Sequence, residues 1–267
     1  MNIEITENFS KELRVAIEAA QSASRIINKY YSGGFKVTIK EDQTPVTEVD
    51  VKAENMIKNI LLENFPAHGF YGEETSRENK EADFLWLVDP IDGTKSFVRG
   101  YPFFSTQIAL MNKGKIILGV SNAPIFNELV YAESGKGAWM ANKQLSVSDI
   151  NQLDSATLST GNLKSLASSQ GWSDLGKIIS TVDRIRGYGD FYHYHLLAAG
   201  KIDAVIESDV NILDIAALSI IINEAGGLFT DLDGNFPCLE TRSVLAANPQ
   251  LHASLQKYLV KQSVIET

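Results

Sequence analysis

Residues 86–97 read Trp-Leu-Val-Asp-Pro-Ile-Asp-Gly-Thr-Lys-Ser-Phe, and no other stretch of the chain is as informative. The residues 84–88 form a continuous apolar run, which predicts a strand buried on both faces. Pro90 fixes its own φ and keeps Asp89 out of the helical conformation. We therefore expect the chain to turn at Asp89, at the carboxyl end of this strand.

The two aspartates of this stretch, Asp89 and Asp92, stand beside a candidate helix start. Gly93 allows the backbone to approach a ligand closely, and Thr94 can open a short helix whose free N–H groups point at an anion. Two hard oxygen ligands next to such a helix start are what a magnesium-assisted phosphoryl site requires. A surface Asp-Pro turn is the alternative, because Asp, Pro and Gly are common turn residues.

A second acidic motif lies in residues 213–227, where apolar residues recur at helical spacing. Gly226 and Gly227 predict the end of this helix. Asp214 falls in its first turn, where a carboxylate is favoured by the positive end of the helix dipole. The pattern fits either a site carboxylate or an aspartate that only caps the helix.

Two further acidic residues come earlier in the chain. Glu73 follows the short apolar stretch 69–71. Thr47 predicts a helix N-cap, and Asp50 falls in the first turn of the amphipathic stretch that follows it. Taken alone, Asp50 is a capping-box carboxylate; beside the other acidic motifs it is also a candidate site residue.

These motifs resemble those of the inositol monophosphatase-like phosphatases, which depend on magnesium and are commonly sensitive to lithium. The resemblance runs from Thr44 to about Gly234, with the motifs in the family's order. It implies that the carbonyl of Ile91 binds metal. It implies the same for four side chains: Glu73, Asp89, Asp92 and Asp214.

The resemblance also implies catalytic roles. Thr94, with Asp50 or Glu73, would take the proton of the attacking water. The amides of Gly93 and Thr94 would hold phosphate oxygens, next to Asp92. Clustered carboxylates repel one another, and divalent cations relieve that repulsion. Hard oxygen ligands favour Mg²⁺, with Mn²⁺ as a substitute, and we expect two or three ions and inhibition by Li⁺.

The substrate is predicted from weaker signals. Lys95 and Ser96 resemble the histidinol-phosphatase branch of the family, and so does the stretch 189–192 with Asp190. Glu207 matches the family glutamate that contacts the alcohol part of the substrate, although a solvated strand end is the alternative. Asp209 would share the face of Glu207 if the strand continues. Carboxylates at Asp190, Glu207 and Asp209 would suit a cationic substrate.

The leading hypothesis is therefore a Mg²⁺-dependent phosphomonoesterase that converts L-histidinol phosphate to L-histidinol and phosphate in histidine biosynthesis. The first alternative is an inositol-1-phosphate phosphatase of broad specificity. A 3′(2′),5′-bisphosphate nucleotidase or a sugar bisphosphatase comes next. A non-catalytic regulatory member of the family is an alternative of another class.

Composition restricts the partners. The net charge of −9 argues against nucleic acid, because phosphate backbones require stripes of Lys and Arg. The single cysteine, Cys238, excludes an internal disulfide and fits the cytoplasm. Residues 1–9, with Glu4 and Glu7, show no apolar signal region, and no run approaches about 18 apolar residues, so we expect no membrane segment. Scattered histidines make a zinc site unexpected, and the family resemblance suggests a homodimer.

The pattern along the chain predicts a mixed α/β fold, and the resemblance implies the five-layered αβαβα sandwich of the inositol monophosphatase/fructose-bisphosphatase type. The expected helices are 10–31, 47–64, 172–180, 190–199, the helix of Asp214 and one after 248–249. The expected strands are 69–72, 84–88, 103–111, 115–123, 128–132, 137–140, 183–187, 202–206 and 228–230. We expect a single unit, 1–267, with sub-domains 1–145 (metal and phosphate) and 146–267.

Overall fold

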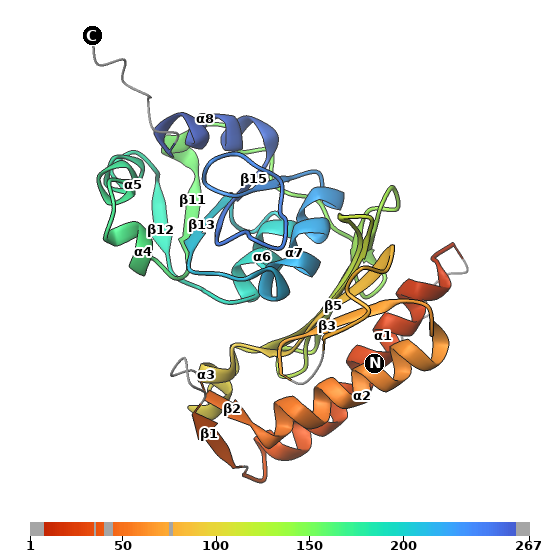
Figure 1. The fold of residues 1–267 in the computed structure, drawn as a ribbon. Helices are drawn as coiled ribbons and strands as arrows, with labels where there is room; N and C mark the ends of the chain where they lie inside the picture. Colours follow the sequence, from red (N-terminus) through yellow and green to blue (C-terminus); the bar gives the residue numbers. More distant parts are fainter. Residues whose placement is uncertain (1–7, 35, 40–44, 75–76, 260–267) are drawn as a thin grey trace.

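The elements of the chain are labelled in Figure 1. The computed structural model describes residues 8–34, 36–39, 45–74 and 77–259. Its helices are α1 (Lys11–Tyr31), α2 (Glu48–Asn64), α3 (Thr94–Val98), α4 (Lys164–Ala167), α5 (Gly171–Ile179), α6 (Tyr192–Ala198), α7 (Ile212–Glu224) and α8 (Pro249–Leu259), with a 3₁₀ turn η1 (Leu153–Ser155). Its strands are β1 (Val37–Ile39), β2 (Pro45–Thr47), β3 (Gly69–Gly72), β4 (Arg77–Glu78), β5 (Phe84–Asp92), β6 (Ser105–Asn112), β7 (Lys115–Ala123), β8 (Glu128–Glu133), β9 (Ala138–Met140), β10 (Lys143–Gln144), β11 (Thr157–Thr160), β12 (Arg184–Arg186), β13 (Ala204–Ser208), β14 (Leu228–Thr230) and β15 (Ser243–Ala247).

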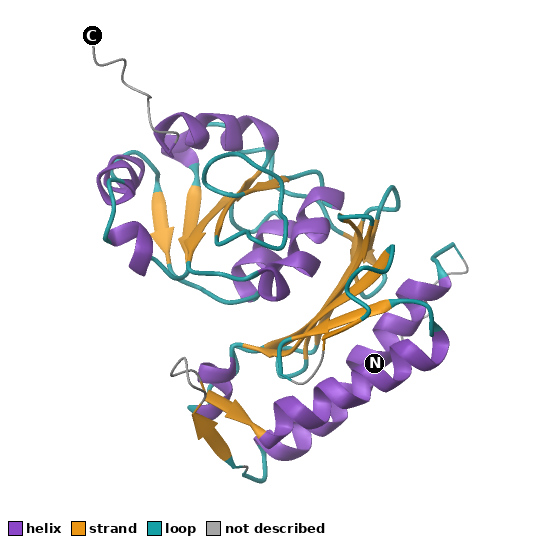
Figure 2. Cartoon of the chain, viewed as in Figure 1, coloured by secondary structure: helices purple, strands orange, loops and turns teal. Residues whose placement is uncertain are grey.

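Helices and sheets alternate in layers (Figures 1 and 2). The larger sheet has the order β10-β9-β8-β7-β6-β5-β3-β4, and it is antiparallel except where β3 pairs with β5. Helices α1 and α2 cover one face of it, and α7 with α6 covers the other. The smaller sheet, β12-β11-β13-β15-β14, lies beyond α6 and has α8 on its outer side. The αβαβα sandwich is thus confirmed.

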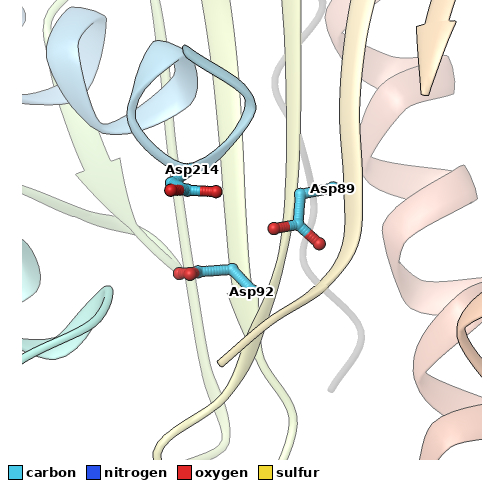
Figure 3. Close-up of side chains that lie close together, drawn as sticks. All are labelled: Asp89, Asp92 and Asp214. Carbon is cyan, nitrogen blue, oxygen red and sulfur yellow. The ribbon is translucent and has the colours of Figure 1, made fainter. Parts of the chain in front are cut away.

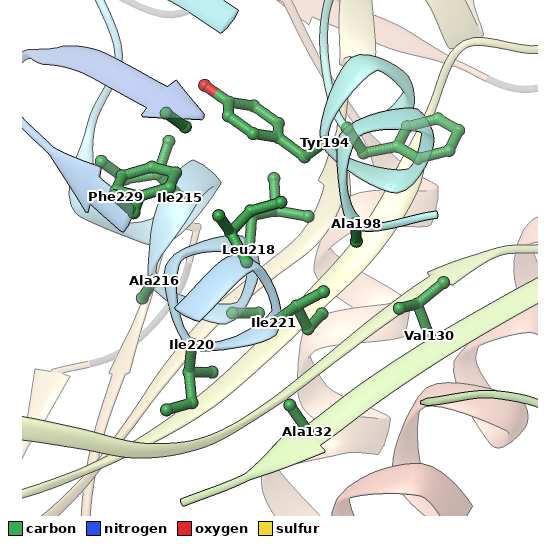
Figure 4. Close-up of a cluster of buried hydrophobic side chains, with 14 of the residues drawn as sticks. Val130, Ala132, Tyr194, Ala198, Ile215, Ala216, Leu218, Ile220, Ile221 and Phe229 are labelled. Atoms are coloured by element: carbon green, nitrogen blue, oxygen red, sulfur yellow. The ribbon is translucent and has the colours of Figure 1, made fainter. Parts of the chain in front are cut away.

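Helix α7 forms the centre of the molecule and determines where the acidic motif at its start is held. Its residues are apolar on nearly all sides, as expected of a helix that is buried between two sheets. Figure 4 shows its side chains, among them Leu218 and Ile221, packed between the strands of both sheets. Gly119 of β7 permits this approach, because a Cβ there would lie 2.6 Å from the carbonyl oxygen of Ala217.

Strand β5 differs from the expectation at its carboxyl end. The strand does not turn at Asp89 but continues to Asp92, with a shift in its register against β6 between these two residues. Such an irregularity accommodates Pro90, which has no N–H to donate to the ladder. The carbonyl of Pro90 instead accepts a hydrogen bond from the Thr106 hydroxyl at 2.9 Å. The expected turn was therefore wrong, and an irregular strand end presents both aspartates.

The other expected helices and strands are confirmed close to their observed bounds, and the short helix predicted at Thr94 is α3. The elements not predicted are β1, β2, β4, β10, β11, β15, α4 and η1. The larger sheet comes from residues 69–144 and the smaller one from 157–247. The division into two sub-domains near residue 145 stays a prediction. Glu4, Glu7 and Thr44 lie outside the described residues. None of the described helices is both long and apolar enough to span a membrane.

Candidate active site

Three aspartates meet where the end of β5 faces the start of α7. One carboxylate oxygen from each of Asp89, Asp92 and Asp214 lies within 4.8 Å of the others. Figure 3 shows the three side chains pointing toward one another from these two elements. Asp89 is 2% exposed and Asp92 is 9% exposed, so the cluster is largely removed from water. Two motifs about 120 residues apart in the chain, as β5 and α7, are thus brought together.

Local hydrogen bonds hold Asp214 in place. Asn211 is the N-cap of α7, and Asp214 is the third residue of the helix in a complete capping box. The backbone N–H of Asn211 donates to Asp214 Oδ2 at 2.9 Å, and its side-chain amide donates to Oδ1 at 2.6 Å. The capping geometry therefore fixes the orientation of this carboxylate.

The cluster is electrostatically costly without a cation. Burial raises the pKa of Asp89 and Asp92 well above their usual range, and the charges of their acidic neighbours raise it further. Burial raises the pKa of Asp214 from 3.8 to about 7, against the opposing hydrogen bonds from Asn211. Among the described residues, no lysine, arginine or histidine forms a salt bridge with these three. Hard oxygen donors without a cationic partner fit a divalent cation.

Glu73 lies beside this cluster, just after β3. Its carboxylate is a neighbour of Asp89, and after burial its charge is the largest cause of the raised pKa of that carboxyl. The segment is held from behind by Glu54 of α2, a fully buried carboxylate that accepts a hydrogen bond from the Glu74 amide at 2.7 Å. Gly72 leaves the space for this contact, because a Cβ there would lie 2.4 Å from the Glu54 carboxyl carbon.

Asp50 and Thr94 lie on the α2 side of the cluster. The Thr94 hydroxyl is 3.2 Å from Asp50 Oδ1 and 2.9 Å from the Ile91 carbonyl oxygen, and it can donate a hydrogen bond to either oxygen. Asp50 is fully buried and also completes a capping box with Thr47. Burial raises the pKa of Asp50, the hydrogen bonds from Thr47 lower it, and the charge of Glu73 raises it again. Asp50 is therefore both the predicted cap and a neighbour of the cluster.

A polar pocket of about 260 Å³ adjoins the cluster. Its described lining is Thr160, Gly161, Asn162, Gly187, Gly189, Asp190 and Glu207. A smaller cavity shares Asp190 and Glu207 with this pocket and is also lined by Asp92 and Asp214, so it connects the pocket to the aspartates. Among the described residues that line the pocket, two are carboxylates and none is a lysine or arginine.

The two carboxylates of this pocket are held differently. Burial alone would raise the pKa of Glu207. The charge of His193 and the hydrogen bonds from His193, Tyr194 and the Asn162 amide outweigh the effect of burial, so the pKa is lowered. The Tyr194 hydroxyl donates to Glu207 Oε2 at 2.8 Å, and His193 Nε2 lies 3.2 Å from the same oxygen. Burial, and then the charge of Glu207, raise the pKa of Asp190.

Three further observations concern the predicted substrate residues. The Ser96 hydroxyl donates to Asp190 Oδ2 at 3.3 Å, so the two segments that resemble the histidinol-phosphatase branch meet in space. The strand that carries Glu207 ends at Ser208, and Asp209 has a left-handed φ of 59°. Asp209 is exposed and accepts a hydrogen bond from the Ser165 amide, so the expected shared face with Glu207 is wrong.

Sequence reasoning did not find the partners of Glu207. His193 and Tyr194 come from α6, and nothing in their spacing indicates that they contact β13. His193 and His195 do diverge on this helix, as their spacing predicts: His193 lies by Glu207, and His195 by Glu128. Their two different partners exclude a shared zinc site between them.

Comparison with known proteins identifies the family. The pattern of the Inositol monophosphatase family matches residues 9–264. A histidinol-phosphatase of Mycobacterium tuberculosis is 36% identical over 84% of this chain and 88% of its own, and an inositol-1-monophosphatase of Caulobacter vibrioides is 33% identical over 91% and 98%. The crystal structure of the extragenic suppressor protein suhB from Bartonella henselae superposes with a TM-score of 0.87, at 32% identity, over 95% of this chain and 100% of that one.

The chain belongs to the inositol monophosphatase family, a family of metal-dependent phosphatases that hydrolyse phosphomonoesters. The resemblance stated from the sequence is thereby confirmed, as is the class of hydrolase. The acidic cluster that such an enzyme requires is present at Asp89, Asp92 and Asp214.

Proposed function

We propose that this phosphatase hydrolyses L-histidinol phosphate to L-histidinol and phosphate, as a step of histidine biosynthesis. The observation that carries the proposal is the acidic pocket next to the aspartate cluster, with Asp190 and Glu207 in its wall and no cationic side chain in the described lining. Histidinol phosphate bears an amine and an imidazole beside its phosphate, so its non-phosphate end is cationic. A pocket with an ionised carboxylate attracts such a group.

Mg²⁺ is the proposed cofactor. The side chains of Asp89, Asp92 and Asp214, with Glu73 and the carbonyl of Ile91, would hold two or three ions, and Mn²⁺ would substitute. When bound, the ions would stabilise negative charge on the phosphoryl and leaving oxygens and make water more acidic. Their binding would also remove the repulsion that now raises the pKa of these carboxyls.

The proposed proton path runs through Thr94 and Asp50. As the oxygen of the attacking water bonds to phosphorus, the water would give a proton to the Thr94 hydroxyl. Thr94 would at the same time pass its own hydroxyl proton to Asp50 Oδ1, which lies 3.2 Å away. The raised pKa of Asp50 makes it a better proton acceptor than an exposed aspartate. Glu73 is the alternative acceptor. The phosphorus–oxygen bond to the alcohol breaks, the leaving oxygen takes a proton from solvent water, and Asp50 returns its proton to the solvent.

Substrate contacts follow from the same arrangement. The amides of Gly93 and Thr94, at the start of α3, and the Asp92 carboxylate are the proposed contacts of the phosphate end. Glu207 and Asp190 are the proposed contacts of the amine. Glu207 suits this role because its lowered pKa keeps it ionised near neutral pH. Asp209 no longer belongs among the proposed contacts, since it is exposed and turned toward Ser165.

An inositol-1-phosphate phosphatase is the second candidate. It is favoured by the inositol-1-monophosphatase relative, whose identity to this chain is close to that of the histidinol-phosphatase relative. Against it stands the acidic pocket, because inositol offers hydroxyls and no positive charge. A homodimer in the cytoplasm without a nucleic acid partner remains part of the proposal, and a bisphosphate nucleotidase remains a weaker alternative.

The test is a comparison of two substrates in two variants. Glu207→Gln removes one charge-assisted hydrogen bond to the amine, which is worth about 1.5–3 kcal/mol, or roughly ten- to a hundredfold in kcat/KM. We expect that loss with histidinol phosphate and little loss with a small neutral phosphomonoester. Asp209→Asn, an exposed carboxylate on the next residue but one, is the matched control and should change neither rate.

Two outcomes would contradict the proposal. Equal losses on both substrates would mean that Glu207 supports the site in general rather than binding an amine. A wild-type preference for inositol 1-phosphate over histidinol phosphate, measured as kcat/KM at saturating Mg²⁺, would refute the histidine-pathway function and leave the second candidate.

A further inference from the structure

A buried chain of polar side chains leads from the aspartate cluster across the face of the larger sheet that α6 and α7 cover, from the end of β5 to the start of β8. Ser105 Oγ lies 3.4 Å from Asp92 Oδ2, and the Gln107 amide nitrogen lies 2.8 Å from Ser105 Oγ and 3.0 Å from Ser121 Oγ. Ser121 Oγ lies 2.8 Å from His195 Nε2. The chain ends where His195 Nδ1 lies 2.9 Å from Glu128 Oε2.

Strand register brings these side chains together. Ser105 and Gln107 stand two apart on β6 and therefore face the same side. Ser105 is the register partner of Asp92, and Gln107 is that of Ser121 on β7. All three are at most 1% exposed. Buried polar groups of this kind are costly unless they are hydrogen-bonded, so the network has a defined arrangement.

The direction of every hydrogen bond follows from the two ends of the chain. An ionised Asp92 carboxylate, the form that would bind metal, can only accept, so the Ser105 hydroxyl donates to it and itself accepts from Gln107. The amide of Gln107 therefore presents its nitrogen, not its oxygen, to both serines. Its Oε1 is buried and has no hydrogen-bond partner among the described residues, which costs stability. With the amide reversed, Ser105 would donate to Gln107 instead, and Asp92 would lose the hydrogen bond from Ser105.

The same logic fixes the tautomer of His195. Ser121 accepts from Gln107, so its proton is available to His195 Nε2, which must be unprotonated to accept it. The proton of the ring then lies on Nδ1 and is donated to Glu128. Burial lowers the pKa of His195, although the bond to Glu128 opposes the shift, so a neutral ring is favoured. One consistent set of proton positions therefore runs from Glu128 to Asp92.

We propose that His195 is a positioning residue for Asp92. It acts through three intermediate side chains: Ser121, Gln107 and Ser105. The imidazole orients the Ser121 hydroxyl, which keeps the Gln107 amide turned so that Ser105 donates to Asp92. The inference rests on the proposed function only in taking Asp92 as a metal ligand, and it is independent of the substrate.

The experiment measures Mg²⁺ binding to the whole protein by isothermal titration calorimetry, without substrate. Partners that orient metal ligands are typically worth ten- to a hundredfold in metal affinity, so we expect Ser105→Ala, Ser121→Ala and His195→Leu each to weaken Mg²⁺ binding by about tenfold. His195→Gln places an acceptor where Nε2 lies, and it should recover most of the wild-type affinity.

His252 provides the matched control. It is also a buried histidine, 4% exposed, whose Nε2 lies 2.9 Å from a hydroxyl, that of Thr230, and it belongs to α8 on the outer side of the smaller sheet. His252→Leu should lower the melting temperature as His195→Leu does, but it should leave Mg²⁺ affinity unchanged. A purely structural role of His195 would make the two variants alike.

A double variant provides the decisive comparison. Ser105→Ala and Ser121→Ala interrupt the same chain, so the double variant should bind Mg²⁺ about as well as Ser105→Ala alone. Independent losses that multiply would overturn the inference, as would a Ser121→Ala protein with wild-type affinity. Both variants make small changes, so the test stands even where His195→Leu fails to fold. A wild-type protein that binds no Mg²⁺ would instead overturn the proposed function itself.

Discussion

Asp214 makes the stability of the metal-free enzyme depend on pH in a way that can be calculated. Its pKa rises from 3.8 to about 7 on folding, so the folded chain binds the proton more tightly than the unfolded chain. Stability without metal must therefore fall as the pH rises from about 4 to 7. For this single group the fall between pH 5 and pH 7 is about 2 kcal/mol, which corresponds to about 4–8 °C in melting temperature.

Asp214→Asn removes that contribution, and the smaller rise that it leaves in the pKa of Asp89 and Asp92 changes the stability in the same direction. Asparagine is close in shape and does not titrate, so its loss of a capping hydrogen bond is the same at every pH. The buried histidines His195 and His252, whose lowered pKa values oppose the trend, are present in both proteins and cancel in the difference. In EDTA, the melting temperature of the variant minus that of the wild type should therefore increase by about 4–8 °C from pH 5 to pH 7.

Mg²⁺ should reverse this difference. The ion binds deprotonated carboxylates, so it should stabilise the wild type more at pH 8 than at pH 6 and stabilise Asp214→Asn much less. Differential scanning calorimetry of both proteins, in EDTA and in 10 mM Mg²⁺ (roughly the excess that saturates a weak site), provides the four curves. A difference between the two proteins that stays constant from pH 5 to pH 7 in EDTA would refute the reasoning.

Two further predictions concern the neighbours of the cluster. Thr94→Ala and Asp50→Asn should lower kcat by roughly 10²–10⁴-fold with little change in KM, because proton transfer is realised in the transition state; if Asp50→Asn lowers only the melting temperature, the residue is a cap alone. Gly72→Ala should destabilise the fold by about 1–3 kcal/mol, since its Cβ would displace Glu54, whereas Gly176→Ala, with open space around it, should not. Thermal melts of both alanine variants decide this, and equal melting temperatures would contradict the packing argument.

The parts of the site that the sequence reveals are those built by local rules. The apolar run before Asp89 predicts β5, Thr94 predicts the start of the short helix α3, and Asp214 falls in the first turn of an apolar helix. Each signal depends on residues within a few positions of one another. The meeting of Asp89 with Asp214 does not follow from spacing; it was implied by the resemblance to a family.

The elements that escaped prediction depend on distant partners. β11 reads Thr-Leu-Ser-Thr and β15 reads Ser-Val-Leu-Ala-Ala, and neither has the β-branched or aromatic run that marks a strand. They become strands because β13 lies between them and offers a ladder on each side. Asp209 shows the same limit, since whether it shares a face with Glu207 depends on where that ladder ends.

The hydrogen-bond network that connects Asp92 to His195 is only weakly indicated by the sequence. Ser105 and Gln107 are polar residues two apart in a strand that is otherwise largely apolar, so both must point to one buried face. That pattern indicates a buried polar cluster, but it names no partner. Ser121 and His195 join it only through the register of β7 and the packing of α6.

The two interpretations that the sequence left open for Asp50 and Asp214, a helix cap or a site residue, are compatible in the structure. In both capping boxes the N-cap amide donates to Oδ2 of the aspartate, from Thr47 at 2.8 Å and from Asn211 at 2.9 Å. In Asp50 the other oxygen, Oδ1, accepts from the Thr94 hydroxyl at the site. In Asp214 the side-chain amide of Asn211 also donates to Oδ1, so the N-cap residue holds both oxygens. A cap thus fixes the rotamer of a carboxylate that repulsion from its neighbours would otherwise turn away. The capping boxes that begin α2 and α7 therefore also orient two acidic side chains of the site. For this reason, the preference of aspartate for the first turn of a helix does not distinguish a capping role from a site role at these two positions.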